Sequence, residues 1–213
     1  MGSKIICIGR QFGSGGHEIA VKTGEQLGIK VYEKNILHLA CKYGDLAVST
    51  MEGADEKATN PYLFQTIHEG NYHVARGLPT SEVLFQLQSH EIRRIAKRES
   101  CIFVGRCADF VLADEDLTLL KVFICAPFDY RIERKAEQEN LSLSNARRLV
   151  KKMDKQRAAY YETYTGRSWG DHNNYDLCFD TSQSKIDDIV CELASVYRGC
   201  RTTVKCDPIF YDT

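Results

Sequence analysis

The sequence predicts an α/β protein with three layers, in which a five-stranded, mostly parallel sheet is flanked by helices. Five short apolar runs alternate with segments of helical periodicity, an order that favours strand–helix–strand units. Several runs are apolar at every position, which requires burial on both faces of the sheet. A glycine-rich turn separates the first run from the first helical segment. In parallel sheets ligands bind at the carboxyl ends of the strands, where this turn lies.

The first half of the chain contains three of the expected strands. The first strand, Ile5–Ile8, ends at Gly9 and precedes a helix over His17–Leu27, which Gly28 is expected to end. The next strand, the next helix, a long helix and the third strand are expected over residues 29–32, 36–42, 82–97 and 101–104.

The second half contains the remaining strands, over residues 119–125 and 176–180. Asp129 is expected to cap a helix over residues 130–137, and Ser142 to cap a longer one that reaches about Tyr161. Asn140 lies at the break between these two helices. The last helix is expected over residues 184–197, with Gly199 at its end.

One domain over residues 1–199 accounts for these elements, followed by a tail over residues 200–213 without periodicity. The stretch between about residues 45 and 80 is interrupted by glycine and proline and has weak periodicity. We expect an irregular, partly helical insertion there. It is long for a passive connection, so a lid or a binding role is plausible.

The composition excludes several classes of function. The chain has 213 residues, 43% of them hydrophobic, and a formal net charge of −1, so no basic surface for nucleic acid is expected. No apolar stretch reaches the roughly 18 residues of a membrane span. The nine cysteines contain no CxxC pair and no zinc-type spacing. They indicate reduced, mostly buried thiols in a cytoplasmic protein.

The segment Gly9–Gly16 has four glycines in eight residues. Glycine permits positive φ, so successive backbone N–H groups can converge on one anion. The N-terminus of the following helix adds unpaired N–H groups and the positive end of its dipole. A tight turn without a ligand is the alternative. We predict a phosphate site made by Arg10, Gly13, Ser14, Gly15, Gly16, His17 and Glu18.

This loop departs from the P-loop pattern GxxxxGK[ST]. Gly16 stands where the lysine is expected and His17 where the hydroxyl residue is expected. Arg10 and Lys22 are the nearest cations, and Lys22 is expected to point away from the loop. The ligands of a metal ion remain unknown at this point.

Four motifs, in this order, resemble the cytidylate-kinase-like family, which comprises relatives of bacterial cytidylate kinase. They are Gly13–Ala20, Gly105–Asp109, Asp154–Tyr161 with Tyr164–Gly166, and Trp169–Asp171 with Asn174–Asp176. The resemblance covers about residues 5–197. It implies a P-loop NTPase-like fold with a nucleoside-monophosphate-binding insertion at about 45–80 and helical lid arms at about 128–165.

The resemblance also implies an activity. ATP with Mg²⁺ would donate its γ-phosphoryl group to a pyrimidine nucleoside monophosphate, CMP or dCMP foremost. Arg106 and Asp109 match the region that holds the acceptor, although the Asp stands two places later than in the family's Gly-Arg-Asp motif. Glu33, after the second strand, is a further candidate for the acceptor site.

Transfer of a phosphoryl group needs cations around the moving group. Arg131, Arg134 and Arg157 are closest to the family's lid positions and are our candidates for this catalytic role. Asp154 could orient Arg157 from three residues away, or be an ordinary ion-pair partner. The alternative is a pair of solvated amphipathic helices with ordinary surface charge.

Two other functions remain open. The missing lysine and hydroxyl also fit a catalytically impaired nucleotide- or phosphate-binding protein, acting as a sensor or interaction module. A kinase for another small phosphorylated or hydroxylated metabolite would use the same fold.

Overall fold

The computed structural model describes residues 3–58 and 66–199, and its centre is a single five-stranded sheet. The strand order is β2-β3-β1-β4-β5, and every neighbouring pair is parallel. The strands are β1 (Lys4–Arg10), β2 (Lys30–Tyr32), β3 (Cys101–Val104), β4 (Thr118–Cys125) and β5 (Leu177–Asp180). All five predicted strands are confirmed. The predicted tail, residues 200–213, lies outside the described residues.

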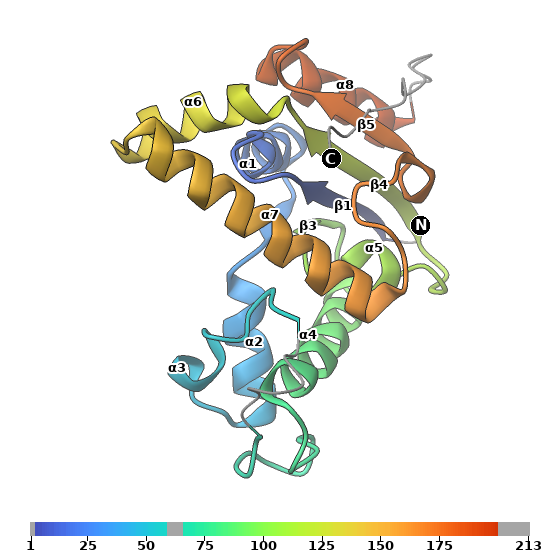
Figure 1. Ribbon diagram of the computed structural model, residues 1–213. Helices are drawn as coiled ribbons and strands as arrows, with labels where there is room; N and C mark the ends of the chain where they lie inside the picture. The colour runs from blue at the N-terminus through green and yellow to red at the C-terminus, as the bar shows by residue number, and fades with distance from the viewer. Residues whose placement is uncertain (1–2, 59–65, 200–213) are drawn as a thin grey trace.

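Helices connect the strands and cover both faces of the sheet (Figure 1). They are α1 (Gly16–Leu27), α2 (Asn35–Gly44), α3 (Val48–Met51), α4 (Thr80–Ala96), α5 (Ala108–Val111), α6 (Phe128–Glu139), α7 (Leu143–Thr165) and α8 (Ile186–Arg198), with a 3₁₀ turn at His172–Asn174.

The alternating side chains of the strands form two separate cores, one on each face. Ile6 and Ile8 of β1 pack on the side covered by α1 and α8. Ile5 and Cys7 of the same strand pack on the side covered by α2, α4 and α5. The period of two along β1 therefore produces the predicted three-layer arrangement.

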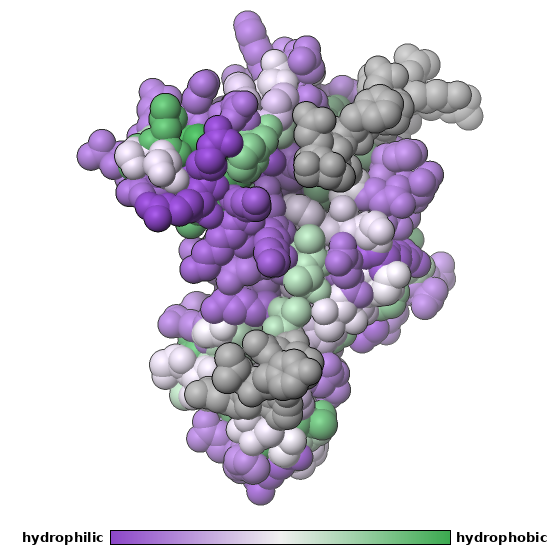
Figure 2. Space-filling model, viewed as in Figure 1, coloured by the Kyte–Doolittle hydropathy of each residue, from purple (hydrophilic) through white to green (hydrophobic). Residues whose placement is uncertain are grey.

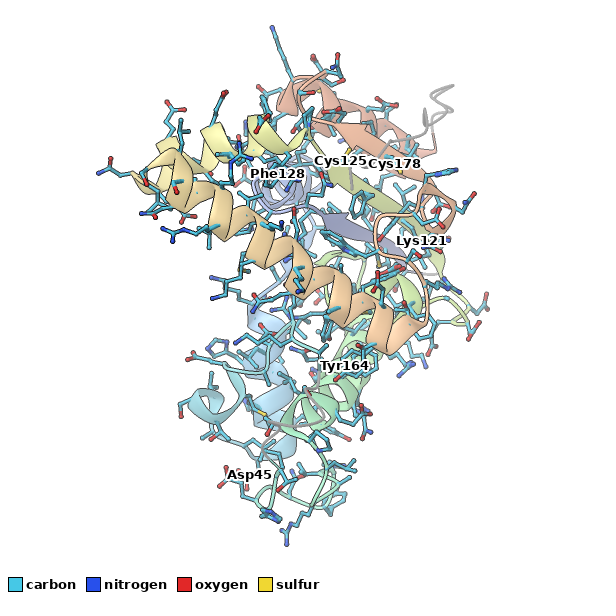
Figure 3. All side chains as sticks on the ribbon, viewed as in Figure 1. Asp45, Lys121, Cys125, Phe128, Tyr164 and Cys178 are labelled. Atoms are coloured by element: carbon cyan, nitrogen blue, oxygen red, sulfur yellow. The ribbon has the colours of Figure 1, made fainter. Side chains whose placement is uncertain are left out.

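The insertion forms a lobe that projects from the sheet with α2, α3 and the start of α4 (Figure 1). Its own small core includes Leu37, Met51, Val74 and Leu84. Asp45, at the end of α2, lies toward the tip of this lobe (Figure 3). Apart from α3 the described part is irregular, as predicted.

Of the two predicted side-chain caps of α6 and α7, one is wrong and one is confirmed. Pro127, not Asp129, occupies the cap position of α6 and offers no side-chain bond, so the prediction for Asp129 was wrong. Asp129 instead pairs with Arg147 at 3.0 Å. Ser142 does cap α7, because its hydroxyl accepts a hydrogen bond from the N–H of Asn145 at 3.3 Å.

Other boundaries differ in length. Helix α5 was not predicted, because four residues are too few to show helical periodicity. Helix α7 continues beyond Tyr161 to Thr165. Tyr164, near its end, stacks on Phe85 of α4 with ring centroids 4.0 Å apart (Figure 3). Packing against another helix extends α7 where sequence propensity is weak.

Two further predictions concern the burial of the cysteines and the lack of a membrane-spanning segment. Cys7, Cys101 and Cys125 are buried, and Cys178 is partly buried. Cys125 and Cys178 lie on the adjacent strands β4 and β5 (Figure 3). Among the described helices, none has the length and hydropathy that crossing a bilayer requires.

Candidate functional site

The glycine-rich loop joins the end of β1 to the start of α1. Gly13 and Gly15 have φ of 84° and 85°, values that favour glycine. Gly15 is the cap residue of α1, so the cap position has no side chain that could accept a hydrogen bond from the helix. The first N–H groups of α1 therefore lack the partners that a side-chain cap would supply, and they face an anion if one binds.

Close packing explains two of the glycines. A Cβ atom on Gly16 would lie 2.5 Å from Cβ of Arg10, and one on Gly15 would lie 2.7 Å from Nη1 of Arg134. Ser14 is fully buried, and its hydroxyl contacts the carbonyl oxygens of Gln11 and Ile124 at 2.9 and 3.0 Å. Ser14 thus ties the loop to β4, and its hydroxyl is not directed toward a ligand.

Cations reach the loop from α6 and α7. A cavity of about 340 Å³, which we call the loop cleft, is lined by the loop together with Arg134, Lys135 and Arg157. Nζ of Lys135 lies 4.6 Å from the centre of the Phe12 ring, and the Arg157 guanidinium lies 5.5 Å from it. Side chains from these helices therefore add positive charge to that of Arg10, which also lines the loop cleft.

Arg131 makes its contacts with the loop backbone and with α7. Its guanidinium donates to the carbonyl oxygens of Ala126 and Phe12 at 2.9 and 3.1 Å, and to the carboxylate of Asp154. The same carboxylate accepts the N–H of Phe12 at 2.8 Å. The suggested pairing of Asp154 with Arg157 is replaced by this contact. A direct catalytic role for Arg131 stays a prediction.

His17, Glu18 and Glu33 also line the loop cleft. Nδ1 of the exposed His17 lies 2.6 Å from Oε2 of Glu33. Glu18 pairs with Arg134 at 2.8 Å and with Lys22 at 3.2 Å. Lys22 also pairs with Asp187 of α8, so it is directed away from the loop as predicted.

Three arginines, Arg10, Arg106 and Arg157, form what we call the arginine cluster, and they surround the carboxylate of Glu56. Oε1 of Glu56 lies 3.0 Å from Nη1 of Arg10 and 4.0 Å from Nη1 of Arg106. Oε2 lies 3.9 Å from Nε of Arg157. Arg10 also pairs with Glu33 at 3.3 Å. The cluster lies at the carboxyl ends of β1 and β3, where a ligand is expected.

Neighbouring charges in this cluster shift the pKa values of Glu56 and Arg157. Burial alone would raise the pKa of Glu56, but Arg10, Arg106 and Arg157 together hold it well below its ordinary range. Burial, and then the neighbouring charge of Arg10, lowers the pKa of Arg157 to about 10. Glu56, Arg10 and Arg157 are therefore ionised at neutral pH.

A second cavity, the lobe cleft, opens on the other side of the cluster. It measures about 470 Å³ and is lined by charged side chains of both signs, including Asp55, Glu56, Arg106 and Lys152. Asp55 accepts hydrogen bonds from Arg106 at 2.7 Å and from Gln88 of α4 at 2.9 Å. Among the described residues, four line both clefts: Arg10, Phe12, Glu33 and Arg157.

Asp109 lies on α5, beside a water-sized chamber of about 20 Å³ behind the arginine cluster. Its carboxylate accepts a hydrogen bond from the hydroxyl of Tyr161 at 2.7 Å, and its burial raises its pKa. It lines neither larger cleft. Its predicted contact with an acceptor stays a prediction.

The structure thus assembles most of the predicted residues, including Glu33 and Arg106, into two adjoining clefts. Sequence reasoning missed Asp55 and Glu56, since they lie in the irregular insertion. It also missed Lys135, which neighbours the predicted Arg134. The charged run from Asp55 to Lys57 was the available signal, but a charge run alone is more often solvated.

Comparisons with known proteins agree with this geometry. A family model described as "Cytidylate kinase-like family" matches residues 5–183. A cytidylate kinase of Methanopyrus kandleri is 28% identical over 194 residues, covering 87% of this chain and 89% of that protein.

Solved structures agree as well. An uncharacterized protein from Eubacterium ventriosum is 28% identical, with a TM-score of 0.68 over 92% of this chain and 99% of the other. The APS kinase CysC of Mycobacterium tuberculosis, in complex with AMPPNP and APS, is 15% identical, with a TM-score of 0.51 over 92% and 98% of the two chains. The second similarity shows the fold alone: a parallel sheet flanked by helices, as in P-loop kinases.

Proposed function

Because the chain belongs to the cytidylate kinase-like family, we propose that it transfers the γ-phosphoryl group of ATP to a nucleoside monophosphate, with CMP or dCMP preferred. One observation carries the proposal: the loop cleft and the lobe cleft meet at Arg10, Glu33 and Arg157, which line both. Transfer between two bound molecules requires adjoining sites with cations at their boundary.

The loop cleft suits the phosphates of ATP. The uncapped N-terminus of α1 offers N–H groups, and the loop approaches closely because Gly13, Gly15 and Gly16 carry no Cβ. Arg134 and Lys135 are proposed to take the place of the P-loop lysine. They come from α6, so the charge reaches the phosphates from outside the loop.

The loop cleft also offers oxygen donors for Mg²⁺. Glu18 and Glu33 line it, whereas the Ser14 hydroxyl is engaged with backbone carbonyls. These two carboxylates, directly or through water, would hold the ion together with the phosphates of ATP. Bound there, Mg²⁺ would neutralise negative charge on the phosphates.

The residues of the chain have separate roles in this proposal. Negative charge spreads over the transferred group as it moves, and Arg157 is proposed to stabilise it at the boundary of the clefts. Asp154 is proposed to act as a positioning residue, because its contacts with Arg131 and with the N–H of Phe12 hold α6 and α7 against the loop. Arg106 is proposed to hold the acceptor, with Asp109 near its base.

The proposal is tested by incubating the protein with ATP and Mg²⁺ and a panel of nucleoside monophosphates, while ADP release is measured. CMP and dCMP should give the fastest release, and omission of the acceptor should abolish it. ADP release at one rate with every acceptor, or without any, would contradict the proposal.

A second candidate is a nucleotide-binding protein without turnover. Gly16 at the lysine position favours it, as does the pairing of Arg134 with Glu18, which partly neutralises the substituting charge. In that case ATP at millimolar concentration would raise the melting temperature by mass action, with no ADP released. The same samples used in the acceptor panel distinguish the two functions.

A further inference from the structure

Glu56 occupies the arginine cluster in the way that a bound anion would. Its Oε1 accepts hydrogen bonds from Nη1 of Arg10 at 3.0 Å and from the backbone N–H of Arg106 at 3.3 Å. Its Oε2 accepts from Nη2 of Arg10 at 3.2 Å, and Nε of Arg157 lies 3.9 Å away. One carboxylate therefore faces three guanidinium groups and a backbone donor.

The surrounding backbone is adapted to this carboxylate. Glu56 has a φ of 52°, a value that is unusual for a residue with a side chain and that is retained only where its surroundings enforce it. A Cβ atom on Gly105 would lie 2.1 Å from Oε1 of Glu56 and 2.2 Å from Nη1 of Arg10. The end of β3 is thus shaped to let the carboxylate and the guanidinium meet.

A carboxylate does not satisfy every donor of the cluster. Arg106 is only 4% exposed, and within the described residues its Nε finds no hydrogen-bond acceptor. Nε of Arg157 likewise has no hydrogen-bond acceptor among the described residues. A phosphate monoester has three terminal oxygens and up to two negative charges, against two oxygens and one charge on Glu56. Phosphate is therefore the better partner for this set of donors.

We propose that Glu56 is a specificity-determining residue: its carboxylate fills the arginine cluster in the free protein, and an acceptor gains the cluster only by replacing it with a phosphate dianion. This inference rests on the proposed function, because it takes the acceptor to be a phosphate monoester. A neutral polyol offers no charge to exchange for that of Glu56. A monocarboxylate offers no more than the resident group.

The expected size of the effect follows from population arithmetic. When the arginines are free in fewer than about one molecule in ten, the apparent affinity for an added anion falls at least about tenfold. Removing the resident carboxylate should restore this lost affinity for the added anion. Glu56→Gln keeps the size of the side chain while removing its charge, so it is the appropriate substitution.

The test uses the full chain and simple anions, without nucleotide. Binding of inorganic phosphate, and separately of acetate, is measured by calorimetry and by thermal shift. Glu56→Gln should bind phosphate at least about tenfold more tightly than the wild type, and should gain affinity for acetate, which replaces the missing carboxylate. Glu115→Gln is the matched control, since Glu115 is similarly shielded and pairs with Arg93 and Lys97 far from the clefts.

Unchanged or weaker phosphate binding by Glu56→Gln would overturn the inference, because Glu56 would then be a permanent partner of the arginines. Hydrogen exchange of the wild type gives a second measurement if this variant does not fold. Added phosphate should accelerate exchange of the amides in residues 52–58, which displacement releases. Slower or unchanged exchange there would equally overturn it.

The two proposals fail in different ways. If CMP is phosphorylated but phosphate affinity is the same in Glu56→Gln and wild type, the role of Glu56 is refuted and the kinase activity stands. If phosphate affinity rises as expected but no nucleoside monophosphate is phosphorylated, the proposed activity is refuted and the anion exchange stands.

Discussion

The loop cleft and the lobe cleft both collect positive charge, but they do so by different means. The loop cleft relies on backbone N–H groups and on cations that reach it from α6 and α7. The lobe cleft relies on arginines at the ends of β1 and β3, and carboxylates of the insertion already pair with them. Side chains of α7 line both clefts. The surface over the middle of this helix is mostly hydrophilic (Figure 2).

If both clefts bind anions as proposed, one fold uses two ways of preparing such a site. A backbone cradle needs no counter-charge, since its partial charges are fixed by the helix and the loop. A cluster of full charges would repel itself when empty, and internal carboxylates remove this cost until a ligand arrives. Substitutions in the two clefts should therefore have different consequences.

The largest effect is expected at Arg157, which belongs to both clefts. Arg157→Gln should lower kcat for phosphoryl transfer by about 10³-fold, because a cation at the transferred group is lost. Steady-state kinetics with ATP and CMP measure this. Arg148→Gln, on an exposed position of the same helix, should leave kcat unchanged. An increase in the acceptor KM alone would assign Arg157 to the lobe cleft only.

The next effect concerns how α7 is held against the loop. Asp154→Asn should lower the free energy of unfolding by about 3 kcal/mol, because it leaves the buried guanidinium of Arg131 without its counter-charge. Urea denaturation measures the loss. The exposed pair Arg147–Asp129 also joins α6 and α7, and Asp129→Asn should cost less than about 1 kcal/mol. Equal losses would mean that burial does not distinguish the two contacts.

A smaller effect on ATP binding is expected when a glycine of the glycine-rich loop, rather than one at another helix end, is replaced by alanine. Gly15→Ala should weaken ATP binding about tenfold, about 1.4 kcal/mol, since the methyl group crowds Arg134 beside the phosphates. Gly28→Ala has a similar backbone penalty, at a φ of 66°, but in the part of the chain that the structure describes nothing lies within 4 Å of the added atom. The KM for ATP should therefore stay at the wild-type value in Gly28→Ala, and a similar rise in both variants would exclude a specific role for Gly15.

The smallest effect is a pH dependence on the lobe side. The folded protein holds the pKa of Glu56 below its unfolded value of about 4.3, so this stabilisation is complete above that value and is lost as the pH falls below it. Between about pH 5 and about pH 3, the wild type should lose more unfolding free energy than Glu56→Gln. Identical slopes in denaturation series would show that the arginine cluster does not stabilise this carboxylate.

The fold could be predicted because its signals are local. Each strand is a short apolar run, and helix ends such as Gly28 and Gly199 carry their own marks, both in the left-handed conformation. The prediction of helices failed where a helix is too short for a period or where its end is held by packing. Helix α5 is too short for a period, and the end of α7 is held by the contact of Tyr164 with Phe85.

The site was predictable to the extent that it is contiguous in sequence. The glycine-rich loop lies within a few residues, and its context identified it. The arginine cluster joins residues far apart, since Arg10 and Glu56 are 46 positions apart and Arg106 lies another 50 beyond Glu56. No periodicity leads from one to the other. The role of Asp154 against Arg131 was likewise hidden, because the contact runs between two helices.

The close approach at Gly105 has a consequence for sequence variation among relatives. Position 105 admits no side chain while the carboxylate of Glu56 and the guanidinium of Arg10 meet beside it. The left-handed φ of 76° at this position adds to the constraint. Residues 56 and 105 should therefore vary together: a relative with a larger residue at 105 is expected to lack the acidic side chain at 56. An alignment of relatives would then identify members in which no carboxylate of the insertion occupies the arginine cluster.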